Sequence, residues 1–217
     1  MSFIHRTDVG PLLWIMSLQY FVVQILVSLA WVIDYSWTQN TISDLGNTVC
    51  GLYGGRVVCS PQHVWMNLSF VALGITQAAG AAMLKKQYSA GILQMAGFVC
   101  MIFAGLGTLV VGLYPENIND VLHSSGAALP FLLGNIGMII LALSFRALPA
   151  VLRVFSGLSG ALGLGALMFF MSHIYLGLGQ GGVERVVAYP QTIWMIVVGT
   201  YLLDILYVRR RAKLSSE

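Results

Sequence analysis

Acidic and basic side chains recur in three polar loops that separate long apolar runs. They are Asp44 in the first loop, Glu116 and His123 in the second, and His173, Glu184 and Arg185 in the third. A carboxylate beside an imidazole can act as general base or general acid. Ionisable groups close to a membrane need a partner or a task to offset their desolvation. We therefore expect these six residues to converge into one candidate catalytic pocket.

The two histidines of this set also suggest a metal ion. Neutral imidazoles ligate zinc, so His123 and His173 with one carboxylate would supply three ligands and leave the fourth position to water. The sequence holds no His-Glu-x-x-His motif, no phosphate-binding glycine loop and no Gly-x-Ser-x-Gly elbow. We therefore expect a zinc site only if the loops that carry His123 and His173 come together.

Each of these residues also has a purely structural interpretation. Glu116 lies just before the apolar run at 122–145, where a carboxylate favours the positive end of a helix dipole. His123 and His173 can form hydrogen bonds at the membrane interface without binding a metal. Glu184 and Arg185 can form a solvated ion pair, which stabilises a fold by roughly 0–1 kcal/mol.

The three cysteines divide into a pair and a single residue. Cys50 and Cys59 lie in a polar segment with three glycines, whereas Cys100 lies inside an apolar run. Glycine adopts the backbone angles of a tight turn without strain, so the segment can fold back on itself. We expect a Cys50–Cys59 disulfide, which requires an oxidising compartment.

The elements that must position these residues are membrane helices. Of 217 residues, 58% are hydrophobic and 9% are charged, compared with roughly 25% charged in soluble domains. The mean hydropathy is +0.82. A spanning helix needs about 20 apolar residues, and runs near that length or longer occur at 11–33, 63–84, 89–113, 122–145, 151–178 and 187–208. The sequence predicts an all-α polytopic bundle of six transmembrane helices that forms one domain over residues 1–217.

Basic residues indicate which way this bundle faces. Nine fall on the side of both chain ends, and only Arg56 and Arg185 fall on the other. The nine are Arg6, Lys85, Lys86, Arg146, Arg153, Arg209, Arg210, Arg211 and Lys213. Since cytoplasmic loops are enriched in Lys and Arg, we expect cytoplasmic termini in a multi-pass protein of the plasma (cell) membrane. The net charge of +3 comes from scattered residues, so we expect the lipid bilayer as partner and no nucleic acid.

The first apolar run also resembles a secretory signal. It follows Arg6, and Ser28-Leu29-Ala30 has the small-x-small pattern of a cleavage site. However, the run is longer than the apolar region of a signal peptide and continues through Trp31-Val32-Ile33. We expect it to be retained, and its cleavage would remove one helix while leaving the others.

Several short sequences, in a fixed order, resemble a known family. They are Thr41-Ile42-Ser43-Asp44-Leu45-Gly46, Cys59-Ser60-Pro61, Met66-Asn67-Leu68-Ser69-Phe70, Gly112-Leu113-Tyr114-Pro115-Glu116 and Gly182-Val183-Glu184-Arg185. Together they resemble the bacterial and archaeal membrane family called domain of unknown function number 998, which implies a six-helix protein with polar sequences at one face. A fainter likeness is to seven-helix alkaline ceramidases, which use Ser, Asp and three His around zinc. The chain differs from those in its six predicted helices.

Three classes of function fit these observations. The first is an outer-face hydrolase that acts on a lipid or lipid-linked substrate, with a carboxylate as general base and His123 or His173 as acid, base or ligand. The second is a small-solute or ion transporter, which would place polar residues near the bilayer midplane. The third is a non-catalytic accessory subunit. We rank the hydrolase first because the polar groups lie at one membrane face.

Reporter fusions test the topology. Alkaline phosphatase fused after Glu217 should be inactive, and the same enzyme inserted between Glu116 and Asp120 should be active, because this reporter folds only outside the cytoplasm. The opposite pattern of activities would refute cytoplasmic termini.

Overall fold

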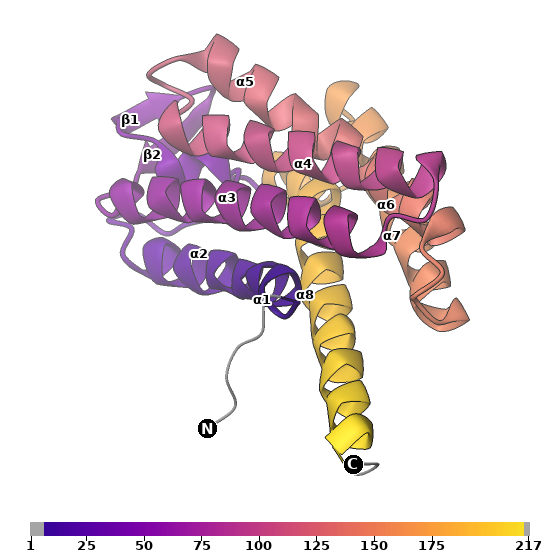
Figure 1. The fold of residues 1–217 in the computed structure, drawn as a ribbon. Coiled ribbons are helices and arrows are strands. Elements are labelled where there is room, and N and C mark those ends of the chain that lie inside the picture. Colours follow the sequence, from indigo (N-terminus) through magenta and orange to yellow (C-terminus); the bar gives the residue numbers. More distant parts are fainter. Residues whose placement is uncertain (1–6, 215–217) are drawn as a thin grey trace.

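Six membrane-spanning helical units form the structure, a computed structural model that describes residues 7–214 (Figure 1). Each is long and apolar enough to cross a membrane, which confirms the all-α polytopic bundle. Its helices are α1 (Val9–Ile15), α2 (Gln19–Leu29), α3 (His63–Tyr88), α4 (Ile92–Leu113), α5 (Asp120–Leu129), α6 (Asn135–Ser144), α7 (Ala150–Met171) and α8 (Gly179–Leu214). Arg6, one of the basic residues used for the orientation, lies outside the described residues, and the side chain of Lys213 is not described.

Two of the six units are built from two helices each. A 3₁₀ turn, Met16–Leu18, joins α1 to α2, and a π-helical segment, Pro130–Gly134, joins α5 to α6. Proline lacks an N–H group and its ring prevents a regular helical hydrogen bond. The wider π turn at Pro130 accommodates it, so the unit from Asp120 to Ser144 crosses as one bent helix.

Glycines allow α3 and α4 to pack closely. A Cβ atom on Gly74 would lie 2.5 Å from the backbone N of Leu109, and one on Gly105 would lie 2.6 Å from the backbone N of Ala78. No larger side chain fits at either position without moving a helix. This close approach is typical of helices that associate in lipid.

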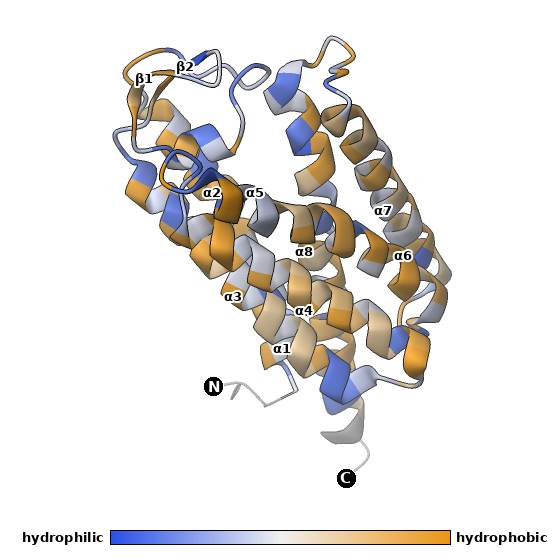
Figure 2. Cartoon of the chain, turned by 90° about the horizontal axis from the view of Figure 1, so that it is seen from above, coloured by the Kyte–Doolittle hydropathy of each residue, from blue (hydrophilic) through white to orange (hydrophobic). Residues whose placement is uncertain are grey.

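The two ends of the bundle carry different elements. The strands β1 (Cys50–Tyr53) and β2 (Arg56–Cys59) lie at one end, and α1 begins and α8 ends at the other (Figure 2). There Arg210 Nη1 donates a hydrogen bond to Asp8 Oδ2 at 2.8 Å. We call the first the hairpin end; it is the end that the basic residues predict to be outside the cell.

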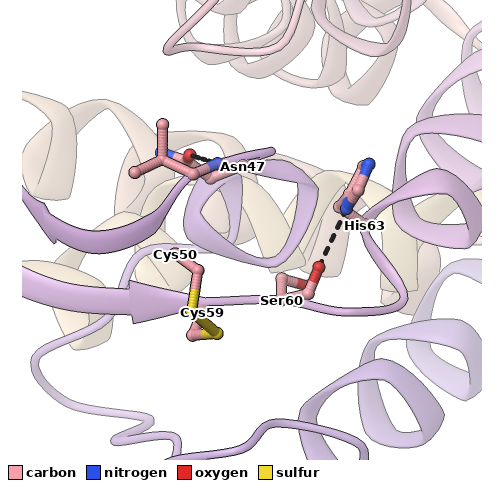
Figure 3. The surroundings of a disulfide bond; sticks show 6 residues. Asn47, Cys50, Cys59, Ser60 and His63 are labelled. Carbon is pink, nitrogen blue, oxygen red and sulfur yellow. Dashed lines mark hydrogen bonds between the residues drawn. A yellow bond between two sulfur atoms is a disulfide. The ribbon is translucent and has the colours of Figure 1, made fainter.

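The Cys50–Cys59 disulfide predicted from the sequence is present (Figure 3). The two cysteines are directly opposite each other in an antiparallel hairpin. Its turn, Gly54-Gly55, has φ of 54° and 78°, as a two-residue turn with positive φ at both central positions requires. The hairpin therefore carries Arg56 on its second strand at a defined position.

Reduction of this disulfide should destabilise the protein by about 2–3 kcal/mol, because a short closed loop restricts the unfolded chain. Intact mass should rise by two hydrogens under denaturing reduction, and the midpoint of denaturant unfolding should fall. The Cys100→Ser variant serves as control and should keep the bridge. Two free thiols at 50 and 59 in unreduced protein would contradict the structure.

Candidate functional site

Asp44, in the 3₁₀ helix Ser43–Gly46, is a fully buried carboxylate at the hairpin end. Arg56 donates to it from Nε and Nη2, both at 2.9 Å. The backbone N–H of Thr41 (2.9 Å) and the side-chain amide of Asn40 (3.1 Å) donate as well. Burial raises the pKa of Asp44, but the hydrogen bonds and charge of Arg56 outweigh it and hold that pKa below its ordinary value. The residue is therefore ionised and fully partnered.

A second carboxyl group, Glu116, lies within hydrogen-bonding reach of Asp44. Asn47 Nδ2 donates to Glu116 Oε1 at 2.7 Å. Burial and the negative charge of Asp44 raise the pKa of Glu116 to about 8. At neutral pH Glu116 is thus mostly protonated, so only one of these two neighbouring carboxyl groups carries a negative charge.

Glu184 and Arg185 lie in α8, not in a loop as the hydropathy of the sequence predicts. The helix begins at Gly179, eight residues before the predicted run. Both side chains are buried. The interpretation of Glu184 and Arg185 as a solvated ion pair is therefore wrong. Glu184 Oε2 accepts from the backbone N–H of Ile42 at 2.5 Å. Arg185 Nη1 donates to the carbonyl groups of Trp37 and Asn40, each at 2.9 Å.

The contacts of Arg185 extend to two aromatic rings. Its guanidinium lies 4.9 Å from the ring centre of Trp37 and 5.5 Å from that of Tyr35, whose hydroxyl accepts a hydrogen bond from it. Cation–π contacts of a desolvated arginine stabilise by about 2 kcal/mol. As a result α8 holds the loop from Tyr35 to Ile42 against the bundle.

His123 contacts the residue just before Asp44. Its Nε2 lies 2.9 Å from Ser43 Oγ, and its Nδ1 lies 2.8 Å from the carbonyl oxygen of Tyr114. His123 is buried in the first turn of α5, and that turn is capped by Asn119, whose side chain accepts from Leu122 N at 3.0 Å. The capped helix end and the Tyr114 carbonyl fix the plane of the imidazole.

A cavity of about 50 Å³ opens beside Ser43. Its walls come from α2, α3, α4, α5, the π-helical segment at Pro130 and α8, and of the site residues described above Ser43 and Glu184 line it. The residues that line it are Tyr20, Ile42, Ser43, Phe70, Leu73, Gln77, Thr108, Val111, Ala127, Pro130, Phe131, Glu184, Ala188, Gln191 and Thr192. Ser43 is partly exposed, and its hydroxyl is the group that joins this cavity to His123.

The structure brings together five of the six predicted site residues. Asp44, Glu116, His123, Glu184 and Arg185 all contact the segment from Trp37 to Asp44 or each other. His173 does not join them: it is exposed after the end of α7, where its Nδ1 lies 3.1 Å from the Tyr175 hydroxyl. Among residues 7–214 no group of three His, Cys, Asp or Glu side chains has the geometry for a metal ion, so the expected pairing of His123 with His173 around zinc has no ligand cluster.

Ser43 is the residue that the six-residue set left out. A hydroxyl carries no charge, and its partner His123 is eighty positions away in the sequence. The only local signal is its place in the polar run Thr41-Ile42-Ser43-Asp44. The hairpin end also depends on Ser60, whose hydroxyl donates to the Leu45 carbonyl at 2.7 Å, and whose own carbonyl oxygen lies 2.9 Å from His63 Nδ1 (Figure 3).

Comparison with protein families gives one match. The model of the family described as "Protein of unknown function (DUF998)" matches residues 15–201. This range includes the hairpin, Ser43, His123 and α8 from Gly179 to Tyr201. No curated protein and no solved structure matches the chain.

The raised pKa of Glu116 predicts how stability depends on pH. Between the ordinary pKa of 4.5 and the folded-state pKa of about 8, folded Glu116 keeps a proton that the unfolded chain releases. Its contribution to stability is therefore complete below about pH 4.5 and is lost as the pH rises through about 8. The melting temperature should fall from pH 5 to pH 9, where each kcal/mol corresponds to about 2–4 °C for a chain of this size.

The Glu116→Gln variant should lose the part of this dependence that comes from Glu116, since its amide is a neutral hydrogen-bonding group that does not titrate. Asp120→Asn, which changes an exposed carboxylate nearby, is the control and should keep it. A pH profile in Glu116→Gln identical to that of the unchanged protein would contradict the raised pKa.

Proposed function

The chain belongs to the DUF998 family, whose description assigns no function, and we propose from the site that it is a membrane-embedded serine hydrolase of acyl esters. The substrate is a lipid or a lipid-linked molecule that enters at the hairpin end. Ser43 is the nucleophile and His123 is the general base and acid. The remaining buried charges hold these two side chains in place.

The observation that carries this proposal is the orientation of the His123 ring. A backbone carbonyl oxygen only accepts hydrogen bonds, so Nδ1, 2.8 Å from the Tyr114 oxygen, carries the proton. Nε2 then has a free lone pair and accepts the proton of the Ser43 hydroxyl at 2.9 Å. A serine hydrogen-bonded to an imidazole whose other nitrogen is fixed is the arrangement that activates a serine nucleophile.

The reaction follows from this geometry in two halves. Ser43 Oγ attacks the ester carbonyl carbon while its proton passes to His123 Nε2, and the same proton then goes to the leaving alcohol. Water attacks the resulting acyl-serine, His123 takes the proton of that water, and the carboxylic acid leaves as Ser43 regains its proton. Water and ester are consumed, and an acid and an alcohol are produced.

In this proposal the buried carboxyl groups do not react with the substrate but hold Ser43 in position. Asp44 and Glu116 already have partners in Arg56 and Asn47, and they brace the 3₁₀ helix that carries Ser43. Glu184 holds the peptide of Ile42, one residue before the nucleophile. Their hydrogen bonds keep Ser43 aimed at His123, which the chemistry needs because small misplacements lower rates strongly.

Two other functions compete with this one. A transporter would use the polar residues of the cavity as a path, and an accessory subunit would need the site only for stability. Both predict that Ser43 has ordinary reactivity. The proposal also places the protein in the cell membrane with its hairpin end outside, in line with the bias of basic residues.

A fluorophosphonate probe, which reacts only with activated serines, tests the proposal on purified protein in detergent. The unchanged protein should be labelled at Ser43 and should hydrolyse p-nitrophenyl acetate. Ser43→Ala should abolish both, and His123→Gln should slow both by about 10²–10⁴-fold, the usual contribution of a general base.

Ser69→Ala is the matched control. Ser69 is a buried serine of α3 whose hydroxyl donates to Gln19 Oε1 at 2.7 Å, so its loss removes a comparable hydrogen bond away from His123. It should leave labelling unchanged. An unlabelled parent protein, or equal labelling of Ser43→Ala, would refute the serine hydrolase and favour the transporter or the accessory subunit.

A further inference from the structure

The cavity beside Ser43 limits which acyl group can be bound. We infer that the substrate is an ester of a short acyl group, of about the size of acetyl, on an alcohol carried by an amphiphilic molecule at the hairpin end. This inference rests on the proposed serine hydrolase. It adds the class of acyl group, which neither the family match nor the catalytic pair specifies.

The size of the cavity is the first argument. It measures about 50 Å³, whereas an apolar cavity of roughly 150 Å³ binds benzene, a molecule of six heavy atoms. In proportion, the space beside Ser43 holds about two heavy atoms. The carbonyl carbon of an acetyl group would lie at Ser43 Oγ, so its methyl carbon and oxygen are two atoms to be housed, and each further methylene of a longer chain would need additional space.

The rigidity of the walls is the second argument. Tyr20 and Phe70 are both buried and pack with ring centres 5.8 Å apart. Phe131, which also lines the cavity, is partly buried and packs against Phe170 with ring centres 6.4 Å apart. Buried, interlocked rings such as Tyr20 and Phe70 resist displacement, so a long chain would have to move both of them at once.

The polarity of the walls is the third argument. Glu184 and the side chains of Gln77, Thr108, Gln191 and Thr192 line the cavity. Glu184, Gln77 and Thr108 already bind protein groups there, and methylenes offer no partner to their remaining polar atoms, so a long chain gains little beside them. A short acyl group covers fewer of these buried polar groups than a long chain does, and the second half of the reaction needs a water molecule close to the acyl-serine.

The alcohol portion of the substrate lies on the other side of Ser43. That side is the hairpin end, where Asp44, Arg56 and Gln180 are linked by hydrogen bonds. A polar alcohol fits such surroundings better than a second acyl chain does. The reaction we infer therefore removes a short acyl group from a hydroxyl of a lipid-linked molecule and releases the short carboxylic acid.

Rates with p-nitrophenyl esters of two, four, eight and sixteen carbons test this inference, with Ser43→Ala as the blank for spontaneous hydrolysis. A pocket that does not fit one methylene discriminates by about 10–200-fold. We expect kcat/KM for the acetyl ester to exceed that for the eight-carbon ester by at least about tenfold.

A cavity-enlarging variant extends the test. Phe131→Ala removes a wall of the cavity and should move the optimum toward four or eight carbons. Phe169→Ala removes the same ring from an exposed position on α7 (41% exposed) and should leave the profile unchanged. If Phe131→Ala does not fold, Val111→Ala enlarges the cavity by less and should raise the four-carbon rate relative to the acetyl rate.

The outcomes separate the two levels of the account. A preference for sixteen carbons in the unchanged protein, or an unchanged profile in a folded enlarging variant, would overturn the short-acyl inference while the serine hydrolase stands. Failure to hydrolyse any of the esters above the Ser43→Ala blank, with no fluorophosphonate labelling, would remove the hydrolase and the inference together.

Discussion

A buried negative charge organises the hairpin end of this protein. Asp44 has no exposed surface, and an ionised carboxylate in such a place is tolerated only when charged and polar donors surround it. Arg56, Thr41 and Asn40 are those donors. Arg56 reaches Asp44 because a disulfide-closed hairpin presents it. Removing one partner would leave the other charge buried and uncompensated, which typically costs 3–5 kcal/mol.

The other polar contacts of the site follow from this arrangement. Once Asp44 is fixed, the backbone on its N-terminal side runs along α8, where Glu184 and Arg185 bind the peptide groups of Ile42, Trp37 and Asn40. Ser43 stands between two constrained neighbours, so its hydroxyl has a defined direction, toward His123. Elements far apart in the sequence thus meet in a region of low dielectric, where hydrogen bonds are strong and unpaired groups are costly.

The sequence predicts the helices well and the site only in part. Six apolar runs correspond to six spans because lipid requires continuous apolar helices, and the disulfide follows from glycines in a short segment. The predicted start of α8 was eight residues too late, because Glu184 and Arg185 have the hydropathy of loop residues. Only their hydrogen bonds to distant backbone groups allow them into a helix at the membrane. His173 was grouped with His123 because both lie in polar loops predicted at the same membrane face, but this placement does not bring their side chains together. Ser43 was left out because nothing local marks an uncharged hydroxyl whose partner is eighty residues away.

The protonation of His123 is the physical fact on which the proposed chemistry depends. Nitrogen NMR of protein with ¹⁵N-labelled histidine reports it directly, because protonated and unprotonated ring nitrogens have well-separated shifts, and the His123→Gln spectrum assigns the signal among the four histidines. We predict a neutral ring at pH 7 with the proton on Nδ1 and a hydrogen-bonded, unprotonated Nε2, whose shift changes in Ser43→Ala. A ring with its proton on Nε2, or a doubly protonated ring, would contradict the account, because neither can accept the proton of Ser43.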